Sequence, residues 1–295
     1  MFARFVLERR NGYEKNNSIL FALLLMPGVV QIVDASSYQN YYGIEMTEEE
    51  YNNLEQLGFE ETDIYYMSED EFNYNKDIEG NLEATSTRYF AHITRYDATG
   101  RIISSNDMEI TEEDYNSEVV MPIGDAYIET TYKRLKTVIA TSGSKYRYKV
   151  TLTWKMMPAV RSHDIIGIGC VSSRVYIDAT SPRFSQTSCI GTSCTNTATY
   201  VGSYIGTNGA GVSFKLPSST SITTLHSFYF YDVNKATSTV TSMIAYGDYA
   251  DAVKTISAGA SDGFWVDQGG IDLVDSIEDY YDTINSANAT WSGSW

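Results

Sequence analysis

Hydrophobic and polar residues alternate strictly between Lys145 and Met156. The hydrophobic positions are Tyr146, Tyr148, Val150, Leu152 and Trp154. The polar positions between them are Arg147, Lys149, Thr151, Thr153 and Lys155. Because successive side chains of a strand point to opposite faces of a sheet, this period of two predicts a strand with its hydrophobic side in the interior and its charged side in water.

The segments around this strand predict how it is placed. Residues 132–141 alternate more loosely and are followed by a turn centred on Gly143, so the two strands should form an antiparallel hairpin. After Pro158, residues 165–171 form a continuous apolar run, which is typical of a strand buried on both faces. A hairpin with one solvent-exposed face, followed by a strand buried on both faces, predicts two stacked sheets.

Further strands are predicted on both sides of this region. Two long segments, 82–96 and 101–110, flank a hairpin turn at 97–100. Shorter strands are expected at 174–178, 199–205, 211–216, 225–233 and 238–249. A count of about nine strands at this spacing is typical of sandwiches. The sequence therefore predicts a mainly β fold, an antiparallel β-sandwich of the jelly-roll-like or Ig-like kind.

Helix signals precede the strands. Thr47 with Glu50, and Ser68 with Glu71, match the capping-box pattern that marks a helix start. We expect residues 46–76 to form two or three short helices, each too short to be stable without packing.

A sharp change in charge marks the end of this helical segment. Residues 45–79 hold thirteen acidic residues and one basic residue, a net charge of −12 out of −17 for the 295-residue chain. We therefore place a boundary near Gly80, between an acidic helical segment at 36–80 and a β-sandwich domain at 81–295. Hydrophobic residues at helical spacing over 271–284 predict that this domain ends in a helix.

The acidic segment has several functional interpretations. It could be an interaction surface, a removable pro-segment or a spacer. The interpretation that we favour is a small helical cap with a solvated acidic face, since runs of charge are most often solvated surface. The strong negative charge disfavours nucleic acid and anionic lipid as partners, because both bind basic surfaces.

The first 35 residues have the features of a secretory signal peptide. Basic residues precede an apolar stretch at 19–33, and cleavage is expected after Ala35. The stretch is shorter than the ~20 residues that a membrane-spanning helix needs. We therefore expect a secreted, extracellular chain without a stable membrane span once the signal peptide is removed.

Three cysteines follow in this chain, which is expected to be exported. Cys189 and Cys194 are close enough in sequence to close a small disulfide loop, with Cys170 left over. The alternative is a bridge between Cys170 and one of the other two. The spacing of the cysteines along the chain does not distinguish between these pairings.

Two sets of residues are candidates for ligand binding. Arg161, His163 and Asp164 lie between two predicted strands, where a polar cluster could bind a ligand or transfer a proton. The alternative that we favour is a polar turn that satisfies its own backbone. Exposed aromatic rings stack on sugars and anchor interfaces, so Tyr229 and Tyr231 are candidates as well. The other tyrosines considered for this role are Tyr41, Tyr42, Tyr200 and Tyr204.

Calcium is the one cofactor that the sequence suggests. Asp262, Asp267 and Asp272 lie among glycines in a turn-rich segment and could supply oxygen ligands, although ordinary loop acids are the alternative. No nucleophile elbow, phosphate-binding loop or zinc-protease motif occurs. The histidines, which we expect to be separate hydrogen-bonded residues, are His92, His163 and His226.

Two segments, TEEEYNNLEQLGFEETDIYYM and YRYKVTLTWKMMPAVRSHDIIGIG, resemble stretches of uncharacterised secreted proteins of Gram-positive bacteria. This resemblance implies no activity. We expect a secreted or cell-surface protein for binding or assembly, without catalytic activity, that recognises a glycan or a protein. Two alternatives stay open. One is a β-pore-forming or membrane-damaging protein with hairpins from 195–214 and 235–250, and the other is a secreted hydrolase with an unrecognised site.

Overall fold

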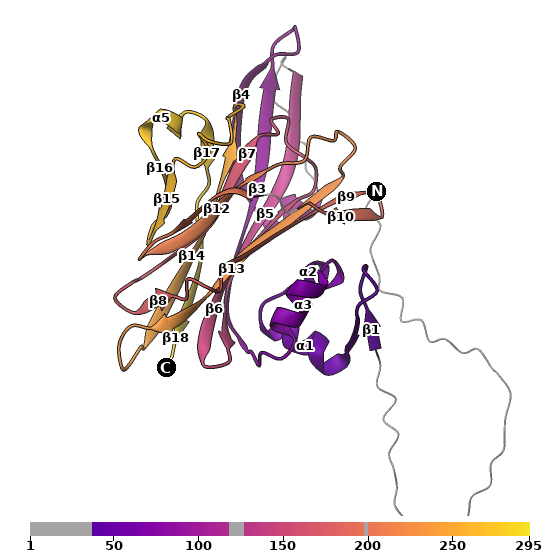
Figure 1. Ribbon diagram of the computed structural model, residues 1–295. Helices are drawn as coiled ribbons and strands as arrows, with labels where there is room; N and C mark the ends of the chain where they lie inside the picture. The colour runs from indigo at the N-terminus through magenta and orange to yellow at the C-terminus, as the bar shows by residue number, and fades with distance from the viewer. Residues whose placement is uncertain (1–36, 118–126, 198–199) are drawn as a thin grey trace, which may run out of the picture. The chain divides into compact units, whose positions relative to one another are not determined.

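Two antiparallel sheets pack face to face around a shared hydrophobic core (Figure 1). The computed structural model describes residues 37–117, 127–197 and 200–295, so the expected signal peptide lies outside the described residues. Tyr148 and Leu152 from one sheet meet Ile166 and Ile168 from the other in the core. The predicted antiparallel β-sandwich is confirmed.

The larger sheet has eight strands. In chain order they are β3 (Leu82–Tyr96), β4 (Ile102–Ile110), β5 (Tyr127–Ser142), β6 (Lys145–Trp154), β8 (Val175–Ile177), β9 (Arg183–Ile190), β10 (Ser193–Asn196) and β13 (Thr224–Lys235). Their order across the sheet is β10-β9-β13-β6-β5-β3-β4, and β8 also pairs with β13.

The smaller sheet has six strands. They are β7 (His163–Cys170), β11 (Tyr200–Ile205), β12 (Gly209–Lys215), β14 (Ser242–Ala252), β17 (Tyr281–Thr283) and β18 (Ala287–Ser292). The order across the sheet is β11-β12-β7-β14-β17, and β18 also pairs with β14. Two small hairpins are formed by β1 (Ser37–Gln39) with β2 (Glu45–Thr47), and by β15 (Phe264–Asp267) with β16 (Gly270–Leu273).

The predicted hairpin is formed by β5 and β6, which pair in register from Ser142 and Lys145 onward. Gly143 makes the turn with a φ of +58°, a conformation that glycine adopts without strain. All five hydrophobic residues of β6 are buried, as predicted. Trp154 at the end of the strand donates a hydrogen bond from Nε1 to the hydroxyl of Tyr249 on β14, at 3.2 Å, and so joins the two sheets.

The charged side of β6 is buried too, and the prediction that it faces water is wrong. The side chains of Arg147 and Lys149 are both 0% exposed. The helical segment covers this face, where Phe59 packs edge-on against Phe228 and Phe230 of β13. An alternating pattern predicts a strand, but it does not show whether charged partners arrive from elsewhere in the chain to cover the polar side.

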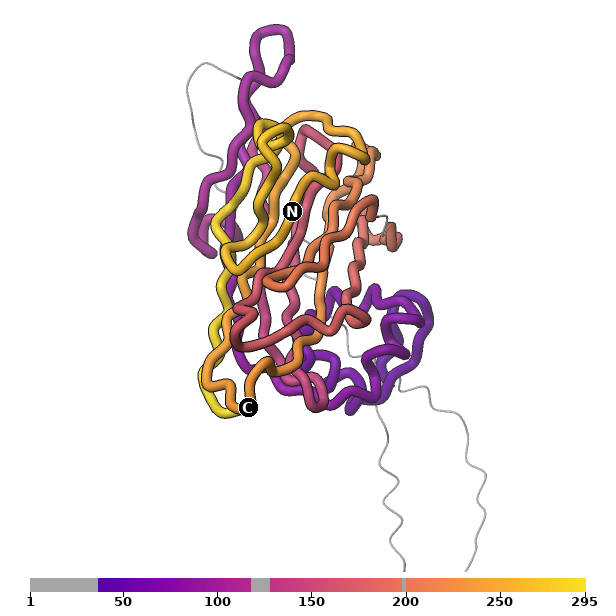
Figure 2. Tube along the Cα trace, turned by 60° about the vertical axis from the view of Figure 1, so that its left-hand side comes forward, coloured from indigo at the N-terminus to yellow at the C-terminus, as the bar shows by residue number. Residues whose placement is uncertain are grey.

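The helical segment forms as its capping boxes predict. Its helices are α1 (Glu48–Gln56), α2 (Glu61–Tyr65) and α3 (Glu69–Asn75). Thr47 caps the start of α1, and Ser68 caps the start of α3. Gly58 follows the C-cap residue of α1 and has a φ of +89°. Figure 2 shows this segment (indigo) on the side of the larger sheet away from the C-terminal strands (yellow). No helix within the described ranges is long and apolar enough to cross a membrane.

The helix predicted over 271–284 is wrong. This segment contains β16, the single turn α5 (Asp275–Glu278) and β17, while α4 (Glu112–Ser117) follows β4 elsewhere. Ile271, Ile277 and Tyr281 still share one small core. A strand, a turn and a second strand bury these residues as well as a helix would, so spacing over so short a segment does not separate the two structures.

Candidate functional site

A groove of about 510 Å³ opens beside the hairpin of β9 and β10. The hairpin lines it with alternate residues of each strand, because these share one face of the sheet. They are Gln186, Ser188, Ile190, Ser193, Thr195 and Thr197. The opposite wall follows β12, over 215–219, and is completed by Ile222. The groove is therefore built from a hairpin of the larger sheet and from a segment that begins at the end of β12 in the smaller sheet.

The groove combines hydroxyl groups with aliphatic surface. Its serine and threonine hydroxyls can both donate and accept hydrogen bonds. Ile190, Leu216, Pro217 and Ile222 supply the aliphatic contacts. Lys215 is the one charged residue in the lining that the structure describes, and none of these lining residues is aromatic. Such a surface suits an extended, largely uncharged ligand with amide-like hydrogen-bonding groups.

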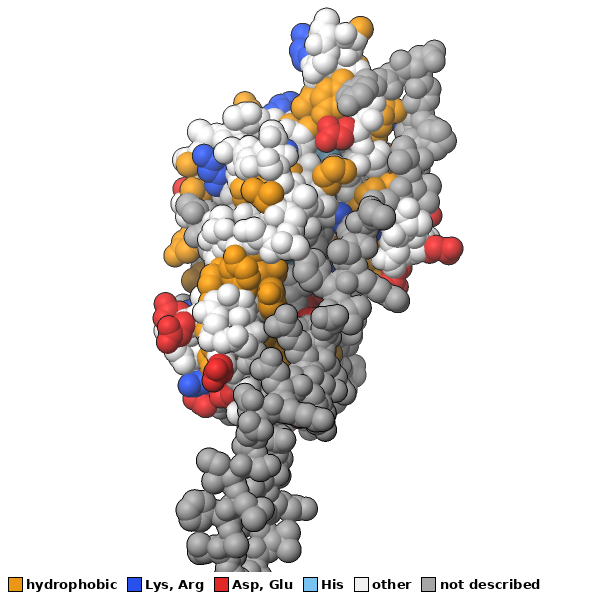
Figure 3. Space-filling model, turned by 90° about the vertical axis from the view of Figure 1, so that its right-hand side faces the viewer, with side chains coloured by type: hydrophobic (Ala, Val, Ile, Leu, Met, Phe, Trp, Pro, Cys, Tyr) orange, Lys and Arg blue, Asp and Glu red, His pale blue; other side chains and the backbone are white. Residues whose placement is uncertain are grey.

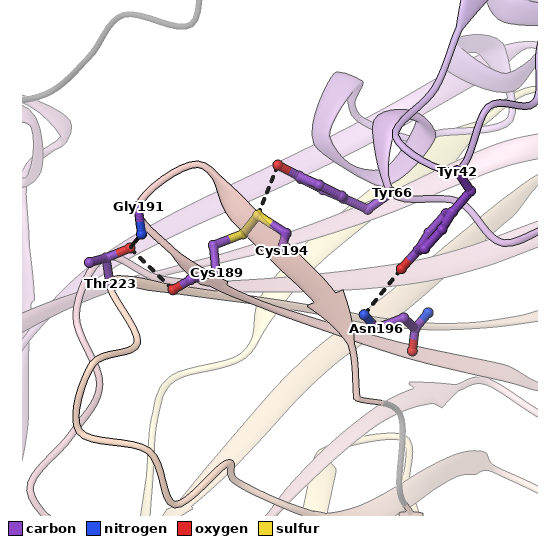
Figure 4. The surroundings of a disulfide bond; sticks show 7 residues. All are labelled: Tyr42, Tyr66, Cys189, Gly191, Cys194, Asn196 and Thr223. Carbon is purple, nitrogen blue, oxygen red and sulfur yellow. Dashed lines mark hydrogen bonds between the residues drawn. A yellow bond between two sulfur atoms is a disulfide. The ribbon is translucent and has the colours of Figure 1, made fainter.

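The opposite face of the same hairpin carries a disulfide (Figure 4). Cys189 and Cys194 lie directly opposite each other in the strand register and are bonded, as one of the two predicted pairings proposed. Tyr66 of the helical segment donates its hydroxyl to the Cys194 sulfur at 2.9 Å. The N–H of Asn196 donates to the hydroxyl oxygen of Tyr42 at 3.1 Å. The hairpin is thus fixed by the helical segment on one face and presents the groove on the other.

Exposed tyrosines gather beside this hairpin. The Tyr41 ring lies 5.2 Å from Tyr42, 6.1 Å from Tyr65 and 5.4 Å from Tyr66, measured between ring centroids. The rings of Tyr41, Tyr42 and Tyr65 are exposed. Figure 3, which shows the side that faces right in Figure 1, has hydrophobic patches among uncharged side chains, with charged groups mostly toward the periphery.

Arg161 supports the wall of the groove instead of binding ligand inside it. Its Nη1 donates to the backbone oxygens of Ser218 and Ser219, at 3.2 and 2.7 Å, and its Nε donates to the backbone oxygen of Pro158. This agrees with the polar-turn alternative, in which such residues satisfy backbone groups. The guanidinium ties the segment after β12 to the turn before β7.

His163 and Asp164 point elsewhere, so the three predicted site residues do not converge. His163 donates from Nδ1 to the backbone oxygen of Ile256, at 3.0 Å. Asp164 is fully buried and accepts hydrogen bonds from the Ala252 N–H, at 3.0 Å, and from the Tyr249 hydroxyl. Burial raises the pKa of Asp164 to about 7 in spite of these donors.

Tyr229 and Tyr231 lie in the core, which corrects the expectation that their rings are exposed. Their exposed fractions are 1% and 0%. The Tyr231 hydroxyl donates to the backbone oxygen of Ile168 in the facing sheet, at 2.8 Å. Aromatic residues on alternate positions of β13 therefore fill the space between the sheets and offer no surface to a ligand.

The three acids proposed for calcium do not form a group of three within the described ranges, although Asp267 lies near Asp272, and burial together with the charge of Asp267 raises the pKa of Asp272. Asp267 accepts a hydrogen bond from the Gly269 N–H at 2.5 Å and shapes the turn between β15 and β16. Asp272 lies opposite Trp265 in that hairpin, and Asp262 is exposed before it. Calcium at these residues stays a prediction from the sequence.

One buried cluster has the donor types of a metal site. His92, Asp107 and Asp251 bring one ligand atom each within 4.8 Å of one another, the one such group found in the described ranges. Lys133 fills the position between the aspartates, with Nζ 2.5 Å from Asp107 Oδ2 and 2.6 Å from Asp251 Oδ1. An ammonium group therefore stands where a metal ion would have to bind.

The remaining histidine and the third cysteine are separate from this cluster. His226 contacts Asp63 and Thr153 between the larger sheet and the helical segment. Cys170 is free and buried, and burial raises the pKa of its thiol to about 11. A thiol that keeps its proton is a poor nucleophile. The three histidines occupy three separate environments, as the sequence predicted.

No family model matches the chain, and no curated protein matches it. Among solved structures, the collagen-binding domain of the Erysipelothrix rhusiopathiae surface protein RspB aligns with 57% of this chain and 67% of its own length, at 7% identity and a TM-score of 0.25. The collagen adhesin of S. aureus aligns with 72% of this chain and 84% of its own, at 9% identity and a TM-score of 0.24. Likeness at this level supports no conclusion about function.

The groove was not predictable from the amino-acid sequence. Its walls come from β9–β10 and from the segment after β12, which are not adjacent in the chain. The sequence signal was weak, because polar residues occupy both sets of alternate positions in β9, with Gln186 and Ser188 on one side and Ser185 and Thr187 on the other. Such a pattern does not show which face lines a groove or which segment stands opposite it.

Proposed function

We propose that this chain is a secreted or cell-surface binding protein without catalytic activity, which holds an extended segment of a protein partner in the groove beside β9 and β10. The groove itself carries the proposal. Its volume of about 510 Å³ is within the range of ligand sites in proteins, and its polar groups and aliphatic contacts line one continuous surface.

The lining favours a polypeptide over a glycan. Sugar rings are commonly held by stacking on aromatic side chains, and the described lining has none. A polypeptide offers amide N–H and C=O groups to the hydroxyls of residues such as Ser188 and Thr195, and small apolar side chains to Ile190 and Ile222. Such a polypeptide can bind without an ion pair between the ligand and the groove.

The rigidity of the groove also supports a binding role. The disulfide holds one wall, and Arg161 holds the other through Ser218 and Ser219. A preformed site avoids the entropy cost of ordering loops when the ligand binds. The disulfide further supports placement outside the cell, because such bonds persist in oxidising compartments.

The pore-forming alternative has less support. Residues 235–250 lie largely in β14, which pairs with β7 on one side and with β17 and β18 on the other. Release of this strand as part of a membrane hairpin would break the centre of the smaller sheet. No comparable cost attaches to binding at a preformed groove.

Panning of a displayed library of short unstructured peptides against the full chain, with a glycan array probed in parallel, tests the proposal. Thr195→Trp fills the groove and should weaken the binding of selected peptides by about tenfold or more. Ile103→Trp places the same ring at an exposed site on β4 and is the matched control. Groove-dependent glycan binding without peptide binding would replace the protein partner with a glycan. If neither probe depends on Thr195, the groove has no binding role.

A further inference from the structure

A lysine, a histidine and two aspartates meet between the sheets. Lys133 of β5, His92 of β3 and Asp107 of β4 belong to the larger sheet, and Asp251 of β14 belongs to the smaller one. Lys133 Nζ is 2.5 Å from Asp107 Oδ2 and 2.6 Å from Asp251 Oδ1. His92 Nδ1 is 3.1 Å from Asp107 Oδ1 and 3.2 Å from Asp251 Oδ2. No side chain of the four is more than 5% exposed.

Aromatic rings enclose the amine. Lys133 Nζ lies 4.7 Å from the centre of the Trp154 ring and 4.9 Å from that of Tyr249. These rings keep water away from the cluster. Burial alone would lower the pKa of Lys133, but the charges of Asp107 and Asp251 outweigh burial and raise that pKa. The amine therefore has to give a proton to a neighbouring carboxylate before it can react.

The two aspartates hold their protons differently. Burial raises the pKa of Asp251 well above its usual value, and the negative charge of Asp107 raises it further. Burial acts on Asp107 as well, but the positive charge of Lys133 and the hydrogen bond with His92 outweigh it and lower the pKa of that carboxyl. Of the two carboxyl groups, Asp251 therefore keeps its proton more readily, and Asp107 loses its proton more readily. Asp251 Oδ2 accepts no hydrogen bond from the described residues.

We propose that Lys133 Nζ condenses with the side-chain carboxyl group of Asp251 to form an amide bond that links the two sheets covalently. The Lys133 ammonium first gives one proton to the Asp107 carboxylate. The free amine then attacks Asp251 Cγ, the C–N bond forms, and the C–OH bond of Asp251 breaks. A second proton from the nitrogen leaves with that hydroxyl as water.

The step is balanced without a cofactor. An ammonium, a carboxylic acid and a carboxylate become an amide, a water molecule and a protonated Asp107, and the net charge stays at zero. The fold holds the reacting groups in contact, and such fixed proximity is equivalent to a very high effective concentration of one group at the other. His92 donates a hydrogen bond from Nδ1 to Asp107 Oδ1, and the same nitrogen lies 3.2 Å from Asp251 Oδ2, so His92 is a positioning residue.

A second buried lysine–aspartate pair in the chain can be compared with Lys133 and Asp251. Lys149 Nζ lies 2.7 Å from Asp63 Oδ2, and both side chains are fully buried. Burial would raise the pKa of Asp63, but the positive charge of Lys149 and the contact with His226 outweigh it and lower the pKa. An ionised carboxylate is a poor electrophile, so this pair should remain a salt bridge. We expect the chain to lose one water molecule and not two.

Intact-mass spectrometry of the reduced and denatured full chain tests the proposal. The expected mass is lower than the sequence mass by one water molecule, and proteolysis should release a branched peptide that joins Lys133 to Asp251. The full sequence mass, with linear peptides that contain Lys133 and Asp251, would overturn the proposal. A branch at Asp107 instead would overturn the assignment of Asp251 as the acceptor.

Variants test the roles of the individual groups. Lys133→Arg should abolish the mass loss, and Lys149→Arg should retain it. Asp107→Asn should fold, as judged by the formation of the Cys189–Cys194 disulfide and by circular dichroism, but remain unlinked because no carboxylate accepts the lysine proton. A branched peptide in Asp107→Asn would overturn the proton-transfer step. Mass loss in Lys133→Arg would overturn the assignment of the lysine. The mass of the unaltered chain decides the main point whether or not a variant folds.

Discussion

The ammonium group of Lys149 lies 2.7 Å from Asp63 Oδ2, and neither side chain is exposed. Lys149 belongs to the sheet and Asp63 to α2, so an ion pair fixes the acidic segment to the sandwich. His226 of β13 contacts the other oxygen of Asp63, and Arg147 donates to Asn75 Oδ1 of α3 at 2.5 Å. The acidic segment is therefore more than a solvated cap, because part of its polar surface pairs with the larger sheet.

Asp63→Asn should destabilise the fold strongly. The substitution leaves the Lys149 ammonium buried without its counter-charge, and breaking a buried pair in this way typically costs about 3–5 kcal/mol. Urea unfolding should show this loss in the free energy of unfolding. Asp70→Asn removes an acid from an exposed position of α3 and should change that free energy by no more than about 0.5 kcal/mol. Equal losses in the two variants would mean that burial of the pair is unimportant.

The capping box of α1 makes a smaller contribution. Thr47 Oγ1 accepts the Glu50 N–H at 3.2 Å, and Glu50 Oε2 accepts the Thr47 N–H at 2.7 Å. Thr47→Ala should lower the free energy of unfolding by about 1 kcal/mol, because the Glu50 N–H at the start of α1 loses its hydrogen-bond acceptor. Thr62→Ala, at an exposed position inside α2, should be neutral or slightly stabilising. A Thr47→Ala variant as stable as the parent would contradict the role of the cap.

Local patterns predicted local structure well. The alternation of β6 predicted the strand and its inward residues, and the pairs Thr47 with Glu50 and Ser68 with Glu71 predicted where α1 and α3 begin. These patterns involve residues within a few positions of one another, where backbone geometry alone sets the spacing.

Contacts between distant segments were not predictable in the same way. The sequence gives the charges of Arg147 and Lys149, but not the return of α2 and α3 over them, although the excess of acids upstream was a signal. Lys133 and Asp251 are 118 positions apart, and neither stands in a motif. The groove likewise needs two separate segments. In each case the fold, and not the local pattern, brings the groups together.

The disulfide should stabilise the wall of the groove locally. Within the described strands, β10 pairs only with β9 and lies at the end of the larger sheet, so Cys189–Cys194 is its main covalent restraint. Replacement of both cysteines by serine should speed amide hydrogen exchange in β9 and β10 and leave exchange in β5 and β6 nearly unchanged. The loop closed by the bond is short, so the loss in global stability should be near 2 kcal/mol. Unchanged protection in β9 and β10 would contradict this assignment.

Asp164 links the stability of the fold to pH. Burial raises its pKa to about 7, whereas an aspartate in an unfolded chain titrates near ~3.9. Between about pH 4 and pH 7 the folded state therefore binds a proton that the unfolded state has released, so the free energy of unfolding falls as pH rises. The ionisable groups that face Asp164 are Tyr249, Tyr281, Lys133, Asp107 and Asp251.

Asp164→Asn should flatten this dependence, because the amide does not titrate. Urea unfolding at intervals across about pH 4 to pH 7 should show a smaller fall than in the parent, by up to about 4 kcal/mol over the range. Burial also raises the pKa of Asp248 to about 7, so the slope should decrease and not vanish. Asp262→Asn changes an exposed acid and should leave the slope as it is. If Asp164→Asn has the slope of the parent, Asp164 is ionised in the folded protein throughout this range, and its burial does not control the effect of pH.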